Sequence, residues 1–198
     1  EKPPVNSVLF FEIRQGNRTG IKKLIEQGGD PNARDKYGDC CIHLAAIDDN
    51  IPVLEDLVSL GADVNIANDK DNTALHIAAE FNQVEMMERL IELGANISAQ
   101  NMVKATPLMT AAIHRSCEAV SLLAKHGADI HARSIKGSTP LHHAAGWGSL
   151  ETVRTLISLG ANVTAKTPLG RSAMDWAHYS NHTAVKAELA KHGAAVLD

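Results

Sequence analysis

Glycine recurs every 33 residues along this 198-residue chain, at Gly28, Gly61, Gly94, Gly127, Gly160 and Gly193. The segments between these glycines contain similar short motifs, such as "TALHIAA", "TPLMTAA" and "TPLHHAA", followed by "LVSLGADVN" and "LISLGANVT". A fixed period of this length predicts a repeat architecture, in which each unit is stable only when it stacks on its neighbours.

Residues 137–165 show what one unit contains. Thr139 and Pro140 suit the N-cap and the first turn of a helix. Apolar residues then recur at helical spacing in two short stretches, first Leu141, Ala144 and Ala145, then Leu150, Val153, Leu156 and Ile157. Gly160 follows, where a left-handed residue ends a helix, and the polar segment "ANVTAKTPLG" predicts a turn or hairpin.

The period, together with the patterns T-P-L-H-x-A-A and L-x-x-G-A-[DN]-[VI], resembles the ankyrin repeat over essentially the whole chain. This resemblance implies an all-α ankyrin-repeat solenoid of stacked helix-turn-helix units with hairpin-like loops. We expect a single domain over 1–198, with an N-terminal capping repeat at about 1–33, internal repeats at 34–66, 67–99, 100–132 and 133–165, and a C-terminal capping repeat at 166–198. Glu12 and Asp175 stand at core-type positions of the two end units, as caps require.

Histidine occupies one register in three units, as His43, His76 and His142, whereas Met109 and Asp175 take the same place in two others. In ankyrin repeats this histidine bridges adjacent loops, so the resemblance implies a structural role. Met109 breaks the pattern, and we expect a looser loop there. His143 is predicted to be a half-buried packing residue, since its register holds Leu44, Ile77, Thr110 and Trp176 in the other repeats.

Composition excludes several classes of partner. The formal net charge is −4 and there is no run of Lys or Arg, which argues against nucleic acid. No apolar stretch approaches the roughly 20 residues of a membrane span, so we expect no membrane insertion. The cysteines are three, an odd number, and Cys40 and Cys41 are adjacent, which predicts a reducing compartment. We expect the cytoplasm. The alternatives are the nucleus and, for a secreted effector, the cytosol of a host cell.

Chemistry-bearing motifs are absent from the sequence. None of the ten histidines has the spacing of a metal site, and there is no GxSxG, Walker or GxGxxG motif. We therefore predict no catalytic residue, no metal and no cofactor, and we interpret Cys40 and Cys41 as residues that begin a helix.

Positions at the end of the inner helix and at the hairpin tip vary between units, and they hold four of the seven aromatic residues. In ankyrin-type proteins these positions line the concave surface, so the resemblance implies a partner-binding strip, which Leu169 extends. Packing against neighbouring helices or another domain is the alternative. The predicted partner-binding residues are Tyr37, Ile47, Phe81, Met102, Val103, Ile113, His114, Ile135, Trp147 and Tyr179.

The predicted function is a non-catalytic protein–protein interaction module that binds a partner protein or an extended peptide on its concave face. Phe81, Ile113 and Trp147 are the expected anchors, with Arg34, Lys36, Arg133 and Arg171 at the rim. The alternative is a recruitment or regulatory domain of a larger enzyme, channel or secreted bacterial effector, suggested by the start at Glu1 rather than Met. We expect a monomer or part of a longer chain. "LVSLGADVN" also resembles segments that an asparaginyl hydroxylase modifies, with Asn65 as acceptor.

Overall fold

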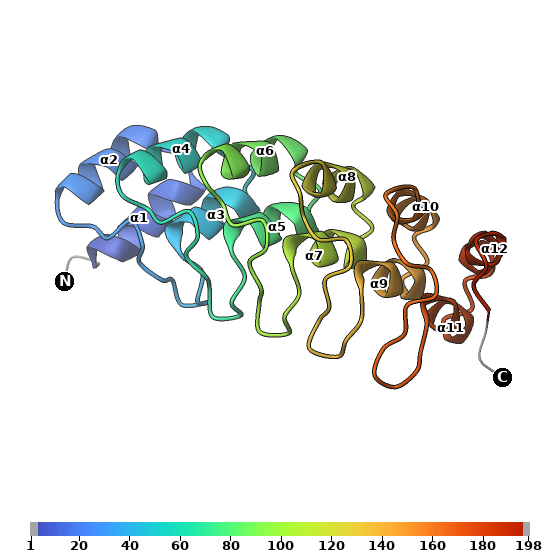
Figure 1. Cartoon of the computed structure of the whole chain (residues 1–198). Coiled ribbons are helices and arrows are strands. Elements are labelled where there is room, and N and C mark those ends of the chain that lie inside the picture. The colour runs from blue at the N-terminus through green and yellow to red at the C-terminus, as the bar shows by residue number, and fades with distance from the viewer. Residues whose placement is uncertain (1–3, 196–198) are drawn as a thin grey trace. The chain divides into compact units, whose positions relative to one another are not determined.

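A computed structural model describes residues 4–195, and within them the chain forms helices joined by turns and loops (Figure 1). No strand occurs in this range, and only two isolated bridges, Arg34 with Cys40 and Lys166 with Ser172, mark the hairpins. The prediction of an all-α helical solenoid is confirmed. The described helices are α1 (Val5–Arg14), α2 (Arg18–Glu26), α3 (Cys41–Ile47), α4 (Ile51–Ser59), α5 (Ala74–Glu80), α6 (Val84–Glu92), α7 (Pro107–Ile113), α8 (Cys117–Lys125), α9 (Pro140–Gly146), α10 (Leu150–Ser158), α11 (Ala173–Tyr179) and α12 (Thr183–Lys191).

The helices group into two compact units. Unit 1 contains the described residues up to Ala78 together with Glu85–Asn96, and unit 2 contains Ala79–Val84 together with the described residues from Ile97 onward. The division runs through α5 and α6. The prediction of a single domain, and the expected repeat boundaries, stay predictions.

Unit 1 is built in two layers. The inner helices α1 and α3 contact each other, and the outer helices α2 and α4 pack behind them and against one another. Leu9, Leu44 and Leu54 are fully buried between the layers. The expectation of a polar cap holds in part: Glu12 is half-buried and accepts a hydrogen bond from Asn17, but the neighbouring Ile13 is buried in the core.

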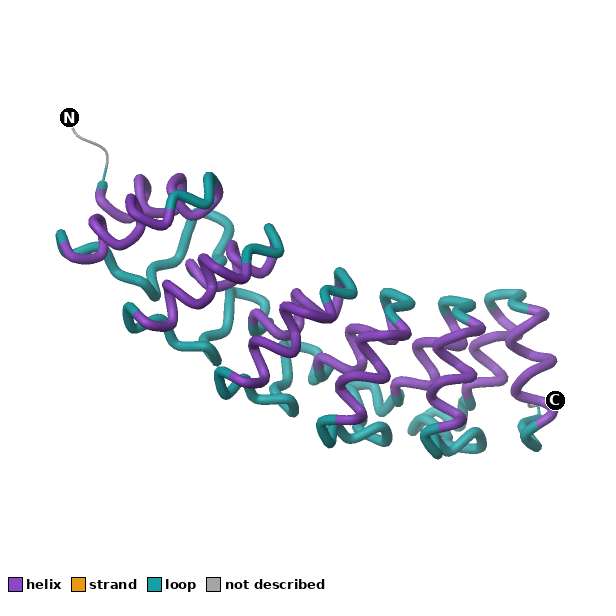
Figure 2. The backbone as a smooth tube through the Cα atoms, turned by 90° about the horizontal axis from the view of Figure 1, so that it is seen from above, coloured by secondary structure: helices purple, strands orange, loops and turns teal. Residues whose placement is uncertain are grey.

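Unit 2 repeats the same arrangement three times. The inner helices α7, α9 and α11 contact one another in series, as do the outer helices α8, α10 and α12, and the hairpins project from the inner layer (Figure 1). In Figure 2 the helix pairs toward the C-terminus lie side by side, each pair joined to the next by a loop. The inner helices have buried alanines at Ala111, Ala144 and Ala177. Small side chains let neighbouring helices approach closely, which suits a core with few aromatic residues.

The helix ends follow the sequence signals. Thr106 caps α7 by accepting a hydrogen bond from the Met109 N–H, and Pro140 occupies the first turn of α9. Gly160 has a positive φ of 93°, as predicted for the residue after α10. At Gly148, with φ of 72°, an added Cβ would lie 2.5 Å from Nδ1 of His182, so this turn requires glycine for both conformation and space.

Candidate partner-binding face

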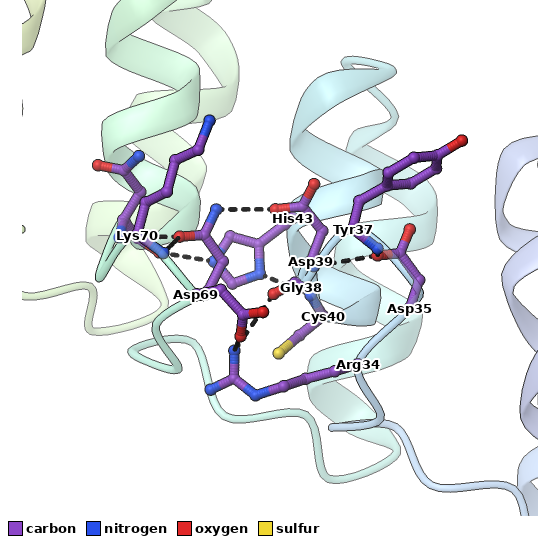
Figure 3. A network of polar contacts seen from close by, with 11 residues as sticks. Arg34, Asp35, Tyr37, Gly38, Asp39, Cys40, His43, Asp69 and Lys70 are labelled. Carbon is purple, nitrogen blue, oxygen red and sulfur yellow. Dashed lines mark hydrogen bonds and ion pairs between the residues drawn. The ribbon is translucent and has the colours of Figure 1, made fainter.

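The recurring histidines connect neighbouring loops within each unit. In unit 1, Nδ1 of His43 accepts the Cys40 N–H at 3.1 Å, and Nε2 lies 2.9 Å from the Asn72 carbonyl oxygen (Figure 3). In unit 2, His142 makes the equivalent contacts with Thr139 and with the Arg171 carbonyl oxygen, at 3.2 and 3.0 Å. Burial lowers the pKa of both imidazoles, so they are neutral at pH 7. The predicted bridging role is confirmed for these two residues.

The other residues in this register are His76, Met109 and Asp175. His76 caps its own helix, where Nδ1 accepts the Thr73 N–H at 3.1 Å. Asp175 performs the same capping at Ser172, whose N–H and hydroxyl donate to its carboxylate, both at 2.7 Å. Met109 is fully buried and cannot form a polar bridge. The hairpin before it is nevertheless joined to the next one, because the Ile135 N–H donates to the Val103 carbonyl at 2.9 Å.

Polar contacts also tie the first two hairpins of unit 1 together (Figure 3). Arg34 donates to the Gly38 carbonyl oxygen and to Asp69, both at 3.2 Å, and Asp39 accepts a hydrogen bond from Asn68. Arg34, predicted at the rim of a binding strip, therefore also stabilises the contact between these two hairpins. Tyr37 points away from this network and is exposed.

The adjacent cysteines are structural. Cys40 caps α3 and Cys41 begins it, and both side chains are fully buried, which confirms their interpretation as helix-start residues. Burial raises the pKa of the Cys41 thiol to about 12, so the thiolate needed for nucleophilic chemistry is not populated at pH 7. Within residues 4–195 no three His, Cys, Asp or Glu side chains are placed to hold a metal ion.

Unit 2 exposes a row of apolar side chains along its inner helices and hairpins. We call this the unit-2 face. Phe81 is 56% exposed and Trp147 55%, whereas Ile113 is half-buried. Among the large apolar side chains that unit 2 exposes within residues 79–195, only Leu159 lies away from this row, at the end of an outer helix. The unit-2 face consists of Phe81, Met102, Val103, Ile113, His114, Ile135, Trp147, Leu169 and Tyr179.

Hydrogen bonds between successive turns position the two large aromatics of this face. Asn82, next to Phe81, accepts the Ala119 N–H at 3.0 Å and donates to Glu118 at 2.8 Å. Arg115 donates through Nε and Nη2 to the carbonyl oxygen of Trp147, at 3.1 and 2.8 Å. Such contacts order the backbone beside each aromatic.

A pocket of about 250 Å³ opens on the unit-2 face. Val103, Ile113 and Ile135 line it together with His143 and Trp176. His143 is half-buried, as predicted, with its ring edge-on to Trp176 at 5.5 Å. Trp176 was not among the predicted partner-binding residues. The signal was present, since Trp176 shares the register of His143 and the two come from neighbouring inner helices.

Two predicted partner-binding residues belong to unit 1. Tyr37 lines an open pocket of about 670 Å³ together with Phe11 and Lys36, and Ile47 is half-buried at the end of α3. The structure brings the other eight predicted residues into unit 2. Phe11, which is exposed beside Tyr37, was not expected at this pocket because the end unit departs from the repeat pattern.

Asn65 is exposed, and its side chain joins two loops of unit 1. Nδ2 donates to the Gly94 carbonyl at 3.1 Å, and Oδ1 accepts the Asn96 N–H at 2.7 Å. Asn32, one period earlier, makes the same pair of contacts with Gly61 and Asp63. This repetition explains an asparagine at the position without any modification.

Comparison with known proteins agrees with the repeat pattern. A family model described as ankyrin repeats (3 copies) matches residues 9–101, 60–134 and 108–197. The chain belongs to the ankyrin-repeat family. Ankyrin repeats are general protein–protein interaction modules that bind protein partners, and the family is typically non-catalytic. A search of curated proteins gave no match.

The count of six ankyrin repeats stays a prediction. Across residues 4–195, no helix has the length and apolar character needed to cross a bilayer.

Proposed function

We propose that the unit-2 face, part of the surface predicted to be concave, binds a partner protein or an extended peptide. Phe81, Ile113 and Trp147 are the anchors. The observation that carries this proposal is the segregation of exposed large apolar side chains in the described part of unit 2, which gather on the hairpins and inner helices with Leu159 as the exception. Scattered apolar residues are normal on a protein surface, but a contiguous row is typical of an interaction site.

Replacing both Phe81 and Trp147 by alanine is expected to reduce partner recovery at least about tenfold, because truncating a hot-spot aromatic costs more than about 1 kcal/mol. The measurement is a quantitative pull-down from cell lysate with wild-type and variant baits of equal helicity. Leu159→Ala is the matched control, since Leu159 is an exposed apolar residue of unit 2 that lies off the face. Equal recovery by all three baits would remove the proposal.

We also propose Asn65 as an acceptor for asparaginyl hydroxylation, on the grounds of its exposed side chain and the resemblance of its segment. Incubation with such a hydroxylase is expected to raise the intact mass by one oxygen atom, and Asn65→Ala is expected to abolish the gain. Peptide mapping then distinguishes Asn65 from Asn32, which makes the equivalent hydrogen bonds. An unchanged wild-type mass, or a gain that persists in the variant, contradicts the assignment.

A cytoplasmic location, and the alternative role as a recruitment domain of a larger enzyme, channel or effector, stay predictions.

A further inference from the structure

The pocket on the unit-2 face is the size of a side chain rather than of a whole ligand. Its volume of about 250 Å³ falls below the roughly 300–1,000 Å³ of small-molecule sites. Val103 comes from one hairpin and Ile135 from the next, and the Ile135 N–H bond to the Val103 carbonyl at 2.9 Å holds the two together. The pocket therefore has a fixed opening between two hairpins of one unit.

Three polar side chains that line this pocket, those of Ser134, Ser138 and His143, are already paired with one another. The Ser134 and Ser138 hydroxyls lie 2.7 Å apart, and the Ser138 hydroxyl lies 2.9 Å from Nε2 of His143. Burial lowers the pKa of His143 to about 4, so these three side chains carry no charge at pH 7. An apolar group that covers these atoms leaves none of them without a hydrogen-bond partner, so the usual penalty for burying polar groups is avoided.

The segments around the pocket are basic although the whole chain has a net charge of −4. Residues 97–116, 130–149 and 163–182 of unit 2 contain one acidic residue, Asp175, which is buried and hydrogen-bonded to Ser172. On the same face Glu80 lies 3.8 Å from His114. The basic residues of these segments are Lys104, Arg115, Arg133, Lys136, Lys166 and Arg171.

The three arginines form hydrogen bonds within unit 2, whereas the three lysines, Lys104, Lys136 and Lys166, are exposed. Arg115, Arg133 and Arg171 donate to a carbonyl oxygen or a hydroxyl of unit 2. Lys104 and Lys136 are exposed, and they directly follow the pocket residues Val103 and Ile135 in the chain. Their ammonium groups form no ion pair with a carboxylate of residues 4–195. A partner therefore meets positive charge immediately beside an apolar opening.

We infer that this pocket receives one apolar side chain of an extended peptide whose neighbouring residues are acidic and lie against Lys104 and Lys136. The inference rests on the proposed function, to which it adds the chemistry of the partner segment. The apolar side chain supplies affinity by burial, and the carboxylates supply orientation and faster association through complementary charge.

Fluorescence polarisation of labelled synthetic peptides with the full 198-residue chain tests this assignment. The reference peptide has one leucine flanked on each side by two glutamates in a Gly-Ser background. Replacing the leucine by alanine is expected to weaken binding at least about tenfold, as burial of a leucine side chain predicts. Replacing the glutamates by lysines is expected to weaken it by a similar factor, and added salt is expected to weaken only the glutamate peptide.

Protein variants locate the contact. Ile135→Ser removes a pocket wall, whereas Leu159→Ser removes an exposed apolar side chain that lies off the unit-2 face and does not line the pocket. We expect at least about tenfold weaker binding for the first and less than about twofold for the second. Lys136→Glu is expected to weaken binding, and Lys125→Glu, the same charge change on the outer helix α8, is expected to leave it unchanged.

The inference is wrong if no glutamate-flanked peptide binds, if leucine and alanine peptides bind equally, or if the lysine-flanked peptide binds as well. It is also wrong if Ile135→Ser and Leu159→Ser have equal effects. None of these outcomes decides the proposed function, which depends on whether Phe81→Ala/Trp147→Ala loses partners that Leu159→Ala retains.

Discussion

Replacing His142 by alanine is expected to lower the free energy of unfolding by about 3 kcal/mol. The imidazole is 1% exposed, and its Nδ1 lies 3.2 Å from the Thr139 nitrogen and 2.8 Å from the Thr139 hydroxyl. Because the backbone N–H can only donate, Nδ1 accepts, and Nε2–H donates to the Arg171 carbonyl oxygen at 3.0 Å. Alanine leaves these buried groups unpaired and also opens a cavity.

Urea unfolding followed by circular dichroism measures the loss, and two variants separate its causes. His131→Ala is the control, because His131 is exposed and its hydrogen bond to Asp129 comes from the backbone N–H. Its effect should stay within about 0.5 kcal/mol. Methionine occupies this register at Met109, one repeat earlier. His142→Met therefore restores side-chain volume without restoring the hydrogen-bonded bridge. We expect its loss to lie between those of the two alanine variants. A His142→Ala loss as small as that of His131→Ala contradicts the bridging role.

Helices and turns were predictable from the sequence because each residue signal has a local physical cause. Thr139 and Pro140 begin α9, and the glycine at position 160 follows α10 with a positive φ, as expected. The bridging histidines were predictable through the family resemblance, since a residue that recurs in register serves the architecture. Ile13 was less predictable, because an end unit departs from the repeat pattern and the register alone does not reveal which side chain turns inward.

The exposed row of the candidate site could be read from the repeat register, but its pocket could not. Phe81 and Trp147 stand at positions whose identity varies between units, which indicates that packing does not determine them. The pocket depends on how far Trp176 of one inner helix and Ile113 of another stand from His143. Those distances arise from packing between the inner helices of unit 2, and the sequence pattern gives register but no distance.

Acidification from pH 7 to 4.5 is expected to destabilise the chain chiefly through its buried histidines. Burial lowers the pKa of His43 and His142 below the ordinary 6.5, and lowers that of His143 to about 4. The unfolded chain therefore binds protons below pH 6.5 that the folded chain does not, so stability rises with pH in this window and is lost as the pH falls toward 4. For His143 alone the loss by pH 4.5 is about 2 to 3 kcal/mol.

The window above pH 4.5 isolates these histidines from the surface ion pairs. Arg18 lowers the pKa of Asp56, and Lys191 and Arg154 lower that of Glu188, so these carboxylates stabilise the fold at neutral pH and lose that contribution only as the pH falls below their ordinary values of 3.8 and 4.5.

His143→Ile is the matched variant for the acid prediction, because isoleucine occupies this register at Ile77 and cannot titrate. Ser138 keeps Ser134 as a partner in this variant, so the substitution leaves a polar contact in the pocket lining. Denaturant midpoints measured from pH 7 to 4.5 should fall less steeply for His143→Ile than for the wild type, with the two free energies of unfolding diverging by about 2 to 3 kcal/mol at the acid end. Parallel curves would mean that the folded chain protonates His143 as readily as the unfolded chain does, and that its side chain is open to water rather than packed in the pocket lining.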